Sequence, residues 1–276
     1  MPTYVVTGVS RGLGFEFLRH LSSDAKNIVI GLVRQKTATE KKVSEELKDA
    51  AGKIHIVTAD LDDYDSIKQA AAETATITGG AIDYLVANAA YVPIDAEFFT
   101  TLDAVAEDPE KLNQDLTNMI KTNVTGNIIL YKLFLPLILK GQGKKVICIT
   151  SGMADIGVIN STGLKESPLY AMSKAAMNVA TAKFNLQYKK DGVLFLGICP
   201  GMVDGDGIDP AKLTQEQMAA AGELMGGFAR VFPDFKGPQP GAVVVPKIIK
   251  VWEEASLEKG DGGKFLPHTG IPGKWI

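Results

Sequence analysis

The chain has 276 residues, of which 46% are hydrophobic and 22% charged, with two cysteines and three histidines. Its 29 basic and 32 acidic residues leave a net charge of −3, so no positive field is available to hold nucleic acid or an anionic membrane. This composition excludes a disulfide-stapled secreted domain, a disordered chain and a membrane protein, and is typical of a globular protein with a substantial core.

The first residues, Met1–Gly8, predict a buried strand rather than a targeting sequence. They carry no basic segment, no extended apolar stretch and no cleavage site, so neither a signal peptide nor a transit peptide fits. The longest apolar stretches, such as Ile128–Leu139, are too short to cross a bilayer and are interrupted by Lys132 and Pro136. We therefore expect a cytoplasmic protein with no membrane partner.

Short apolar runs alternate along the chain with longer segments of helical periodicity. The predicted strands are Tyr4–Thr7, Asn27–Val33, Ile54–Thr58, Tyr84–Ala87, Lys145–Thr150, Val193–Cys199 and Lys264–Leu266. The predicted helices are Leu13–Ser22, Glu40–Ala51, Ser66–Thr76, Lys111–Leu139, Leu169–Lys189 and Ala242–Ala255. Strands that are apolar on both faces and alternate with helices indicate parallel βαβ units. We predict one α/β domain over residues 1–276, with a doubly wound, mostly parallel, Rossmann-type sheet of about seven strands and helices on both faces.

Residues 205–237 are predicted to form an insertion that covers the substrate. Two interpretations of its apolar residues stay open: they cover a bulky apolar ligand, with Gly226–Gly227 as a hinge, or they form the buried face of a short helix. These residues are Met218, Leu224, Met225, Phe228, Val231 and Phe232.

The first predicted strand runs directly into a glycine-rich turn and then into a helix. Gly8 permits a tight reversal, Gly12 lets the backbone approach a pyrophosphate, and Gly14 allows the helix and the strand to pack closely. The N-terminus of the helix directs N–H groups and the positive end of its dipole at the phosphates. The turn therefore predicts a dinucleotide site. Its candidate cofactor-binding residues are Gly8, Ser10, Arg11, Gly12, Leu13 and Gly14.

The spacing TGxxxGxG at Thr7–Gly14 resembles the short-chain dehydrogenase/reductase family, whose compact single-domain branch is similar to the chain from Thr3 to its C-terminus. The long segment Met153–Leu169 and the ending Gly263–Leu266, followed by a Trp near the terminus, are similar to the C-factor-like or carbonyl-reductase-like subgroup. The resemblance implies an oxidoreductase with a nicotinamide cofactor.

Charge near the second predicted strand decides which cofactor is expected. An acidic residue at the end of that strand would bind the ribose 2′-hydroxyl and repel a 2′-phosphate. The chain has Arg34 there and Arg11 inside the glycine turn, and guanidinium groups favour a phosphate. We therefore predict NADP(H) rather than NAD(H). The charge runs Glu40–Lys42 and Glu45–Glu46 are interpreted as a solvated helix face.

Two further segments resemble cofactor-binding motifs of the family. Asp60 and Leu61, after the third predicted strand, match its adenine-edge motif, in which a carboxylate accepts a hydrogen bond from the adenine amino group. Asn88 and Ala89, after the fourth, match its NNAG motif, although the usual first Asn and final Gly are both alanine here. The resemblance implies that Asn88 retains the amide that stabilises the backbone.

Tyr170 and Lys174 form a YxxxK motif on a predicted helix. Their spacing of four places both side chains on one face of the helix. A tyrosine normally ionises near pH 10, and a nearby ammonium favours the phenolate, which brings acid–base chemistry toward neutral pH. We predict that Tyr170 is the general acid and that Lys174 assists it and holds the ribose of the cofactor.

The resemblance implies two more catalytic residues. Ser151 ends the fifth predicted strand, where the family places a hydroxyl that binds the substrate carbonyl oxygen as it gains charge. Thr150 is the alternative hydroxyl. Asn123 matches the family's polar residue on the long helix, where it helps to hold a water that links Lys174 to solvent. A simple packing role for Asn123 also stays open.

Pro200, Gly201 and Val203 resemble the family's PGxV segment beside the nicotinamide. A Thr often follows this segment, but the chain continues with Asp204, so that hydroxyl contact is absent from the sequence. Cys148 and Cys199 lie in buried strands and are predicted to pack in the core. No metal site is predicted, because the three histidines have no acidic or cysteine partner at metal-binding spacing.

Together these residues predict an NADP(H)-dependent oxidoreductase that reduces a ketone or aldehyde, of medium or bulky and fairly apolar character, to an alcohol. Two alternatives stay open: a cofactor-binding signalling or interaction module with weak turnover, and an imine or enone reductase of a biosynthetic pathway. By resemblance we expect a homodimer or homotetramer that pairs through Lys111–Leu139 and Leu169–Lys189.

Overall fold

A seven-stranded, fully parallel sheet forms the centre of the computed structural model, which describes residues 1–92, 99–204, 211 and 213–275. The strands lie in the order β3-β2-β1-β4-β5-β6-β7. Their bounds are β1 Thr3–Thr7, β2 Ile28–Val33, β3 Ile54–Thr58, β4 Tyr84–Ala87, β5 Lys145–Ile149, β6 Leu194–Cys199 and β7 Phe265–Pro267. The predicted Rossmann-type fold class is confirmed, and every predicted strand is present to within one residue at either end.

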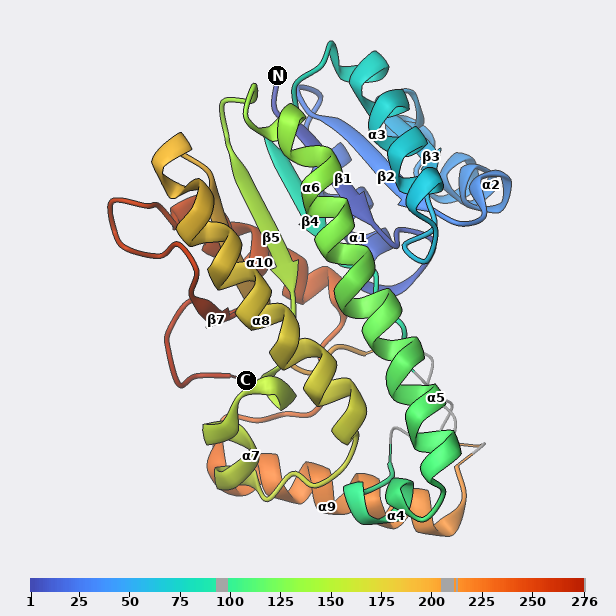
Figure 1. Ribbon diagram of the computed structural model, residues 1–276, viewed down its shortest axis with the longest axis vertical. Helices are drawn as coiled ribbons and strands as arrows, with labels where there is room; N and C mark the ends of the chain where they lie inside the picture. The colour runs from blue at the N-terminus through green and yellow to red at the C-terminus, as the bar shows by residue number, and fades with distance from the viewer. Residues whose placement is uncertain (93–98, 205–210, 212, 276) are drawn as a thin grey trace.

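Helices cover both faces of this sheet (Figure 1). One face packs on α1 (Gly12–Ser22) and α10 (Gly241–Glu254), and the other packs on α3 (Tyr64–Thr78), α6 (Asn127–Ile138) and α8 (Pro168–Tyr188). Among the described residues, no helix combines the length and the hydropathy that crossing a membrane would require.

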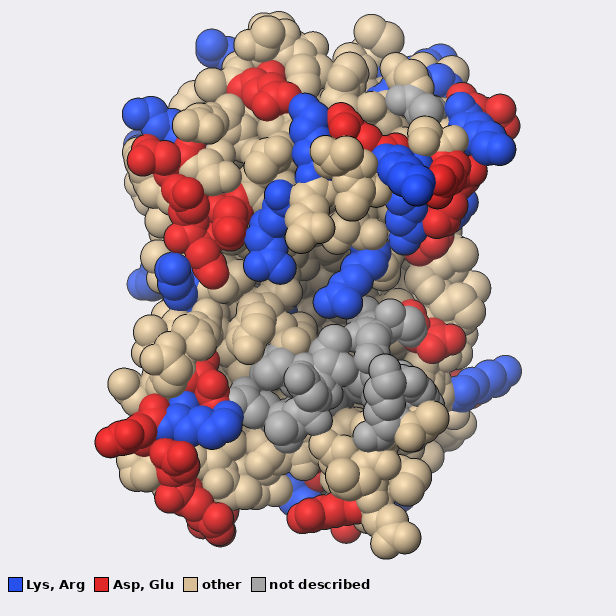
Figure 2. Space-filling view, turned by 90° about the vertical axis from the view of Figure 1, so that its right-hand side faces the viewer, with Lys and Arg blue, Asp and Glu red and all other residues tan. Residues whose placement is uncertain are grey.

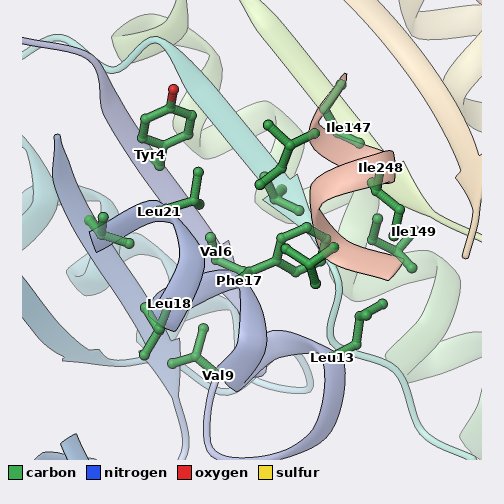
Figure 3. Close-up of a cluster of buried hydrophobic side chains, with 14 of the residues drawn as sticks. Tyr4, Val6, Val9, Leu13, Phe17, Leu18, Leu21, Ile147, Ile149 and Ile248 are labelled. Carbon is green, nitrogen blue, oxygen red and sulfur yellow. The ribbon is translucent and has the colours of Figure 1, made fainter. Parts of the chain in front are cut away.

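Large apolar side chains fill the layer between the sheet, α1 and α10. The ring centroids of Phe17 on α1 and Trp252 on α10 lie 5.6 Å apart, and neither residue is exposed to solvent. Figure 3 shows part of this cluster, in which α1, β1, β5 and α10 contribute Leu13, Phe17, Leu18, Leu21, Tyr4, Val6, Ile147, Ile149 and Ile248. Such burial is the main source of stability of a sheet covered on both faces.

The helix that follows β2 begins four residues earlier in the structure than the sequence pattern predicts. The structure has α2 at Lys36–Glu46, followed by a 3-10 segment, η1, at Lys48–Lys53, whereas the sequence pattern predicted one helix over Glu40–Ala51. The early start brings Thr39 into the protein, where it is buried and its hydroxyl donates to the carbonyl of Gln35 at 3.0 Å. A charged helix with few apolar residues gives no periodic signal for its first turn.

The predicted long helix Lys111–Leu139 consists of three parts. These are α5 (Pro109–Ile120), a π-helical segment η2 (Lys121–Gly126) and α6. A π segment inserts a residue into the helical ladder and is frequently found at functional sites. It lies here where Gly126 approaches the backbone of Leu61 so closely that a Cβ would overlap the Leu61 carbonyl.

A further layer lies beyond the carboxyl ends of the strands. It contains α4 (Leu102–Ala106) and α7 (Ile156–Thr162), which the sequence pattern did not predict, and α9 (Gln215–Val231), which agrees with the interpretation of the apolar residues of 205–237 as one face of a helix (Figure 1). The candidate hinge at Gly226–Gly227 is wrong, because both residues lie inside α9. Gly227 packs so tightly on α7 that a Cβ there would overlap the carbonyl of Thr162. Residues 205–210 and 212 of the predicted insertion lie outside the described residues, and its covering role stays a prediction.

His268, at the end of β7, makes folding sensitive to acid. Its backbone N–H donates to the carbonyl of Cys199 at 2.8 Å, and only 5% of the residue is exposed. Burial, together with the nearby Lys247 cation, lowers the pKa of the imidazole from 6.5 to about 4. The folded state therefore binds this proton less readily than the unfolded chain.

We predict that this contribution to stability is complete above pH 6.5 and is lost as the pH falls from 6.5 through about 4. Between pH 7 and pH 4 the free energy of unfolding of the wild type should fall by about 3 kcal/mol more than that of His268→Gln, in urea titrations at matched salt. Equal losses in the two proteins would show that His268 does not govern the acid response.

Candidate active site

A cavity of about 1780 Å³ opens at the carboxyl ends of the strands. This is where open α/β sheets bind ligands, and its volume exceeds the roughly 300–1,000 Å³ of a pocket for one small ligand. Figure 2 shows Lys and Arg side chains bordering the hollow that crosses this face of the molecule. All predicted site residues except Asn123 line the cavity. They are Gly8, Ser10, Arg11, Gly12, Leu13, Gly14, Arg34, Asp60, Leu61, Asn88, Ala89, Ser151, Tyr170, Lys174, Pro200, Gly201 and Val203.

The glycine turn has the geometry that close approach of a dinucleotide requires. Gly8 has φ 73° and Gly12 has φ 54°, and both lie in the left-handed region that favours glycine. A Cβ at Gly14 would overlap the carbonyl of Gly8, so a side chain there would push the turn away from helix α1. The residues of this turn thus fit the pyrophosphate of a nicotinamide cofactor, with the N-terminus of α1 facing it.

The loop after β4 is fastened to the same turn. The Thr7 hydroxyl accepts hydrogen bonds from the backbone N–H groups of Asn88 at 3.0 Å and Ala89 at 2.9 Å. The Asn88 amide in turn donates to the carbonyl of Thr7 at 3.0 Å. The side chain of Asn88 therefore holds the backbone of the turn. This contact is made although Ala87 stands where the NNAG pattern has its first Asn.

Three cationic side chains from different segments line one end of the cavity. Arg11 and Arg34 were predicted to bind the cofactor, and Lys42 of α2 joins them. The Lys42 ammonium lies 4.1 Å from the centroid of the Phe15 ring and 3.5 Å from the carbonyl oxygen of Ser10. Its carboxylate neighbour, Glu46, is 4.0 Å away. Sequence analysis assigned Lys42 to a solvated face. A helix start at Lys36 would have placed Ala38, Thr39 and Lys42 on one face toward the turn.

Asp60 and Leu61 lie beside this end of the cavity, after β3. The Asp60 carboxylate accepts from the N–H of Asp62 at 3.0 Å, and the Asp60 N–H donates to the Ser66 hydroxyl at 3.0 Å. These bonds fix the loop that carries the carboxylate, whose predicted contact with adenine stays a prediction.

Tyr170 and Lys174 occupy neighbouring turns of α8 and both line the cavity. The Lys174 ammonium lies 5.7 Å from the centroid of the Tyr170 ring and donates to the carbonyl of Ile149, at the end of β5, at 2.9 Å. Only 5% of Lys174 is exposed, and this burial lowers the pKa of its ammonium. A cation that is costly to bury is thus held next to the phenol by a carbonyl of the sheet.

Ser151 follows β5 and begins the 3-10 segment η3 (Gly152–Ala154), where its hydroxyl accepts from the N–H of Met153 at 3.2 Å. The alternative hydroxyl, Thr150, also lines the cavity, but its Oγ1 is buried and has no hydrogen-bond partner among the described residues. The Ser151 hydroxyl is therefore the one that the local backbone orients.

Cys199 joins the two loops on either side of this point, a role that sequence analysis missed. Its sulfur accepts hydrogen bonds from the N–H groups of Gly152 at 3.0 Å and of Gly201 at 3.3 Å. Burial raises the pKa of the thiol to about 11, so the sulfur stays protonated at neutral pH. The predicted core packing of Cys199 accounts for its burial but not for these two bonds.

Asn123 is buried in the π segment and does not line the cavity. Its side-chain oxygen accepts from the N–H of Tyr91 at 2.6 Å, and its amide donates to the carbonyl of Tyr91 at 2.9 Å and the Ser173 hydroxyl at 3.0 Å. These bonds tie the π segment to the loop after β4 and to α8. The predicted water link from Asn123 to Lys174 stays a prediction.

The sequence matches the short chain dehydrogenase family over residues 2–216. The chain belongs to this family. It is 50% identical over 276 residues to the short chain dehydrogenase virK of Hypocrea virens, with all of both chains covered, and 45% identical to the short-chain dehydrogenase/reductase iacC of Pestalotiopsis fici, with 98% of each covered. It is therefore an oxidoreductase of a family that uses a nicotinamide cofactor.

Solved structures of carbonyl reductases share the fold. The NADPH-bound carbonyl reductase from chicken fatty liver superposes with a TM-score of 0.74 at 22% identity, covering 98% of this chain and 97% of that one. The carbonyl reductase Sniffer of D. melanogaster gives a TM-score of 0.74 at 21% identity, covering 99% and 98%.

Proposed function

We propose that the protein is an NADPH-dependent reductase that converts an apolar ketone or aldehyde to an alcohol. The observation that carries this proposal is the buried Lys174 ammonium beside the Tyr170 ring, in a cavity that Ser151 and the glycine turn also line. The family relationship and the likeness to carbonyl reductases support a reductase.

NADPH, when bound against the glycine turn and the Pro200–Gly201 segment, supplies the hydride. Tyr170 donates a proton from its hydroxyl to the substrate oxygen. Ser151 donates a hydrogen bond to that oxygen as it gains negative charge. The ammonium of Lys174 stabilises the phenolate that remains and binds the hydroxyls of the ribose. Oxidation of the alcohol uses the same groups in reverse.

The preference for NADPH is supported by Arg11, Arg34 and Lys42. A ribose 2′-phosphate would meet three cations that come from the glycine turn, the end of β2 and α2. Charge-assisted hydrogen bonds to phosphate are about twice as strong as neutral ones, whereas a free 2′-hydroxyl would gain little from these groups. Lys42 has no closer carboxylate among the described residues than Glu46 at 4.0 Å, so a phosphate competes with only a weak ion pair.

We predict that Tyr170→Phe lowers kcat for NADPH-dependent ketone reduction by about 10²–10⁴-fold, since the variant lacks the proton donor. NADPH binding, measured by fluorescence titration, should change little because the ring remains.

Ser151→Ala should also cause a large loss of kcat for ketone reduction. If Ser151→Ala left most activity intact, imine or enone reduction would fit better. A wild type that binds NADPH but reduces no carbonyl in a broad panel would contradict the proposed function.

We predict that Arg34→Gln and Lys42→Gln each raise the Kd for NADPH by about tenfold, through the loss of one charge-assisted contact, and leave the Kd for NADH nearly unchanged. Lys41→Gln is the matched control, because Lys41 is a neighbour on α2 whose side chain is 76% exposed and does not line the cavity. Equal effects on both cofactors would show that these cations do not contact a 2′-phosphate.

We also propose that the protein associates with copies of itself through α8 and the neighbouring segment from α5 to α6, as the family resemblance implies. Met172, Val179 and Leu186 are spaced seven residues apart on α8, and they are 42%, 61% and 61% exposed. Residues two turns apart lie on one helix face, so these side chains form an exposed apolar stripe.

We predict a dimeric or tetrameric mass for the wild type in sedimentation at micromolar concentration, and dissociation in the double variant Val179→Lys/Leu186→Lys. Ile156→Lys is the control, since Ile156 is 75% exposed on α7 and away from the stripe. A monomeric wild type would refute the proposed association.

A further inference from the structure

Trp275, the penultimate residue, lies at the active-site cavity rather than in a loose terminus. It is 9% exposed and lines the cavity together with Ser151 and Gly152. Its ring packs in a tilted arrangement against Phe265 of β7, with the centroids 4.7 Å apart and the planes at 45°. The preceding turn is closed by the Thr269 hydroxyl, which donates to the carbonyl of Lys274 at 2.6 Å. The contact with Phe265 and the closed turn together hold the indole at the cavity.

The benzene edge of the indole faces the loop that carries Ser151. Atom Cε3 lies 3.8 Å from the point where a Cβ on Gly152 would be, so a side-chain carbon placed there would just touch the ring. Gly152 also donates its N–H to the sulfur of Cys199 at 3.0 Å. The ring thus borders the cavity one residue away from the hydroxyl that is proposed to bind the substrate oxygen.

Trp275 belongs to an apolar wall that joins the sheet to the outer layer of helices. We use this name for the six cavity-lining residues Val158, Cys199, Met202, Leu224, Phe228 and Trp275. The wall contains two aromatic rings, two sulfur atoms and no charged group. A carboxylate or phosphate on a substrate would lose its hydration here without gaining an ionic partner from the wall. An aromatic ring would gain ring–ring and sulfur–aromatic contacts as well as burial.

We propose that Trp275 is a specificity-determining residue, whose indole binds substrates that carry a flat, unsaturated ring next to the reacting carbonyl. This inference rests on the proposed reductase function and names the substrate class of the same site. The ring of the substrate lies against the indole and the wall while its carbonyl oxygen reaches Ser151 and Tyr170. Uncharged aryl ketones are then preferred over saturated ketones of equal size.

Acetophenone and cyclohexyl methyl ketone test this directly, because they differ mainly in the planarity and unsaturation of the ring. The measured quantity is the ratio of kcat/KM for acetophenone to kcat/KM for cyclohexyl methyl ketone, with NADPH as the cofactor. This ratio should be about 2- to 12-fold higher in the wild type than in a variant without the aromatic contact. Trp275→Leu should lose this preference, and Trp275→Phe should keep most of it. The Kd for NADPH should stay the same in both variants. Ile271→Ala, in the same tail but 51% exposed and outside the cavity lining, should behave as the wild type.

A second readout needs no turnover. The other tryptophan, Trp252, is fully buried against Phe17, so fluorescence lost in Trp275→Phe reports on Trp275. Acetophenone added to the complex with NADP⁺ should quench this part of the emission. The inference on Trp275 is overturned if the ratio of kcat/KM for the two ketones is the same in Trp275→Leu as in the wild type, or if acetophenone does not quench Trp275. If the wild type still reduces ketones in that case, the proposed reductase function stands. Quenching without reduction of any ketone would refute the reductase and retain the ligand contact.

Discussion

The hydrogen bond from the buried Lys174 ammonium to the carbonyl of Ile149 connects the chemistry to the sheet. A lysine that is 5% exposed is tolerated only where a polar partner compensates part of its lost hydration. The partner here is a main-chain carbonyl at the end of a central strand, in a residue that pairs with Ile198 of β6, so it cannot move without disturbing that ladder. Because Tyr170 lies one turn before Lys174 on α8, the same bond also fixes the distance of the phenol from the strand ends.

The loops around this point are tied to one another rather than held separately. Thr7 and Asn88 connect the turn after β1 to the loop after β4, and Asn123 connects that loop to α8. The sulfur of Cys199 then joins the loop after β5 to the loop after β6. Strands that are neighbours in a parallel sheet thus share side chains at their carboxyl ends. Pre-organisation of this kind lets the polar groups act without reorganising during the reaction.

Sequence analysis was strong where a residue's role depends on its nearest neighbours in the chain. The strands, the glycine turn and the i, i+4 pair of Tyr170 and Lys174 are local patterns, and the structure places them together in one cavity. Lys42 was missed because it depends on where α2 begins, and the mainly polar first turn of α2 carries no apolar periodicity. The helices α4 and α7 were missed for a related reason, since they are short and bury few of their residues.

The two ends of the cavity differ in how far apart their residues lie in the chain. The cationic end uses residues within Arg11–Lys42, from the turn after β1 to helix α2, so a short stretch of sequence contains most of its information. The apolar wall combines residues from α7, the end of β6, α9 and the C-terminal tail, which are separated by up to about half the chain. No spacing rule connects Val158 with Trp275; only the parallel order of β5, β6 and β7 brings them together. The substrate end is therefore specified by topology, and its chemistry becomes readable only once the fold is known.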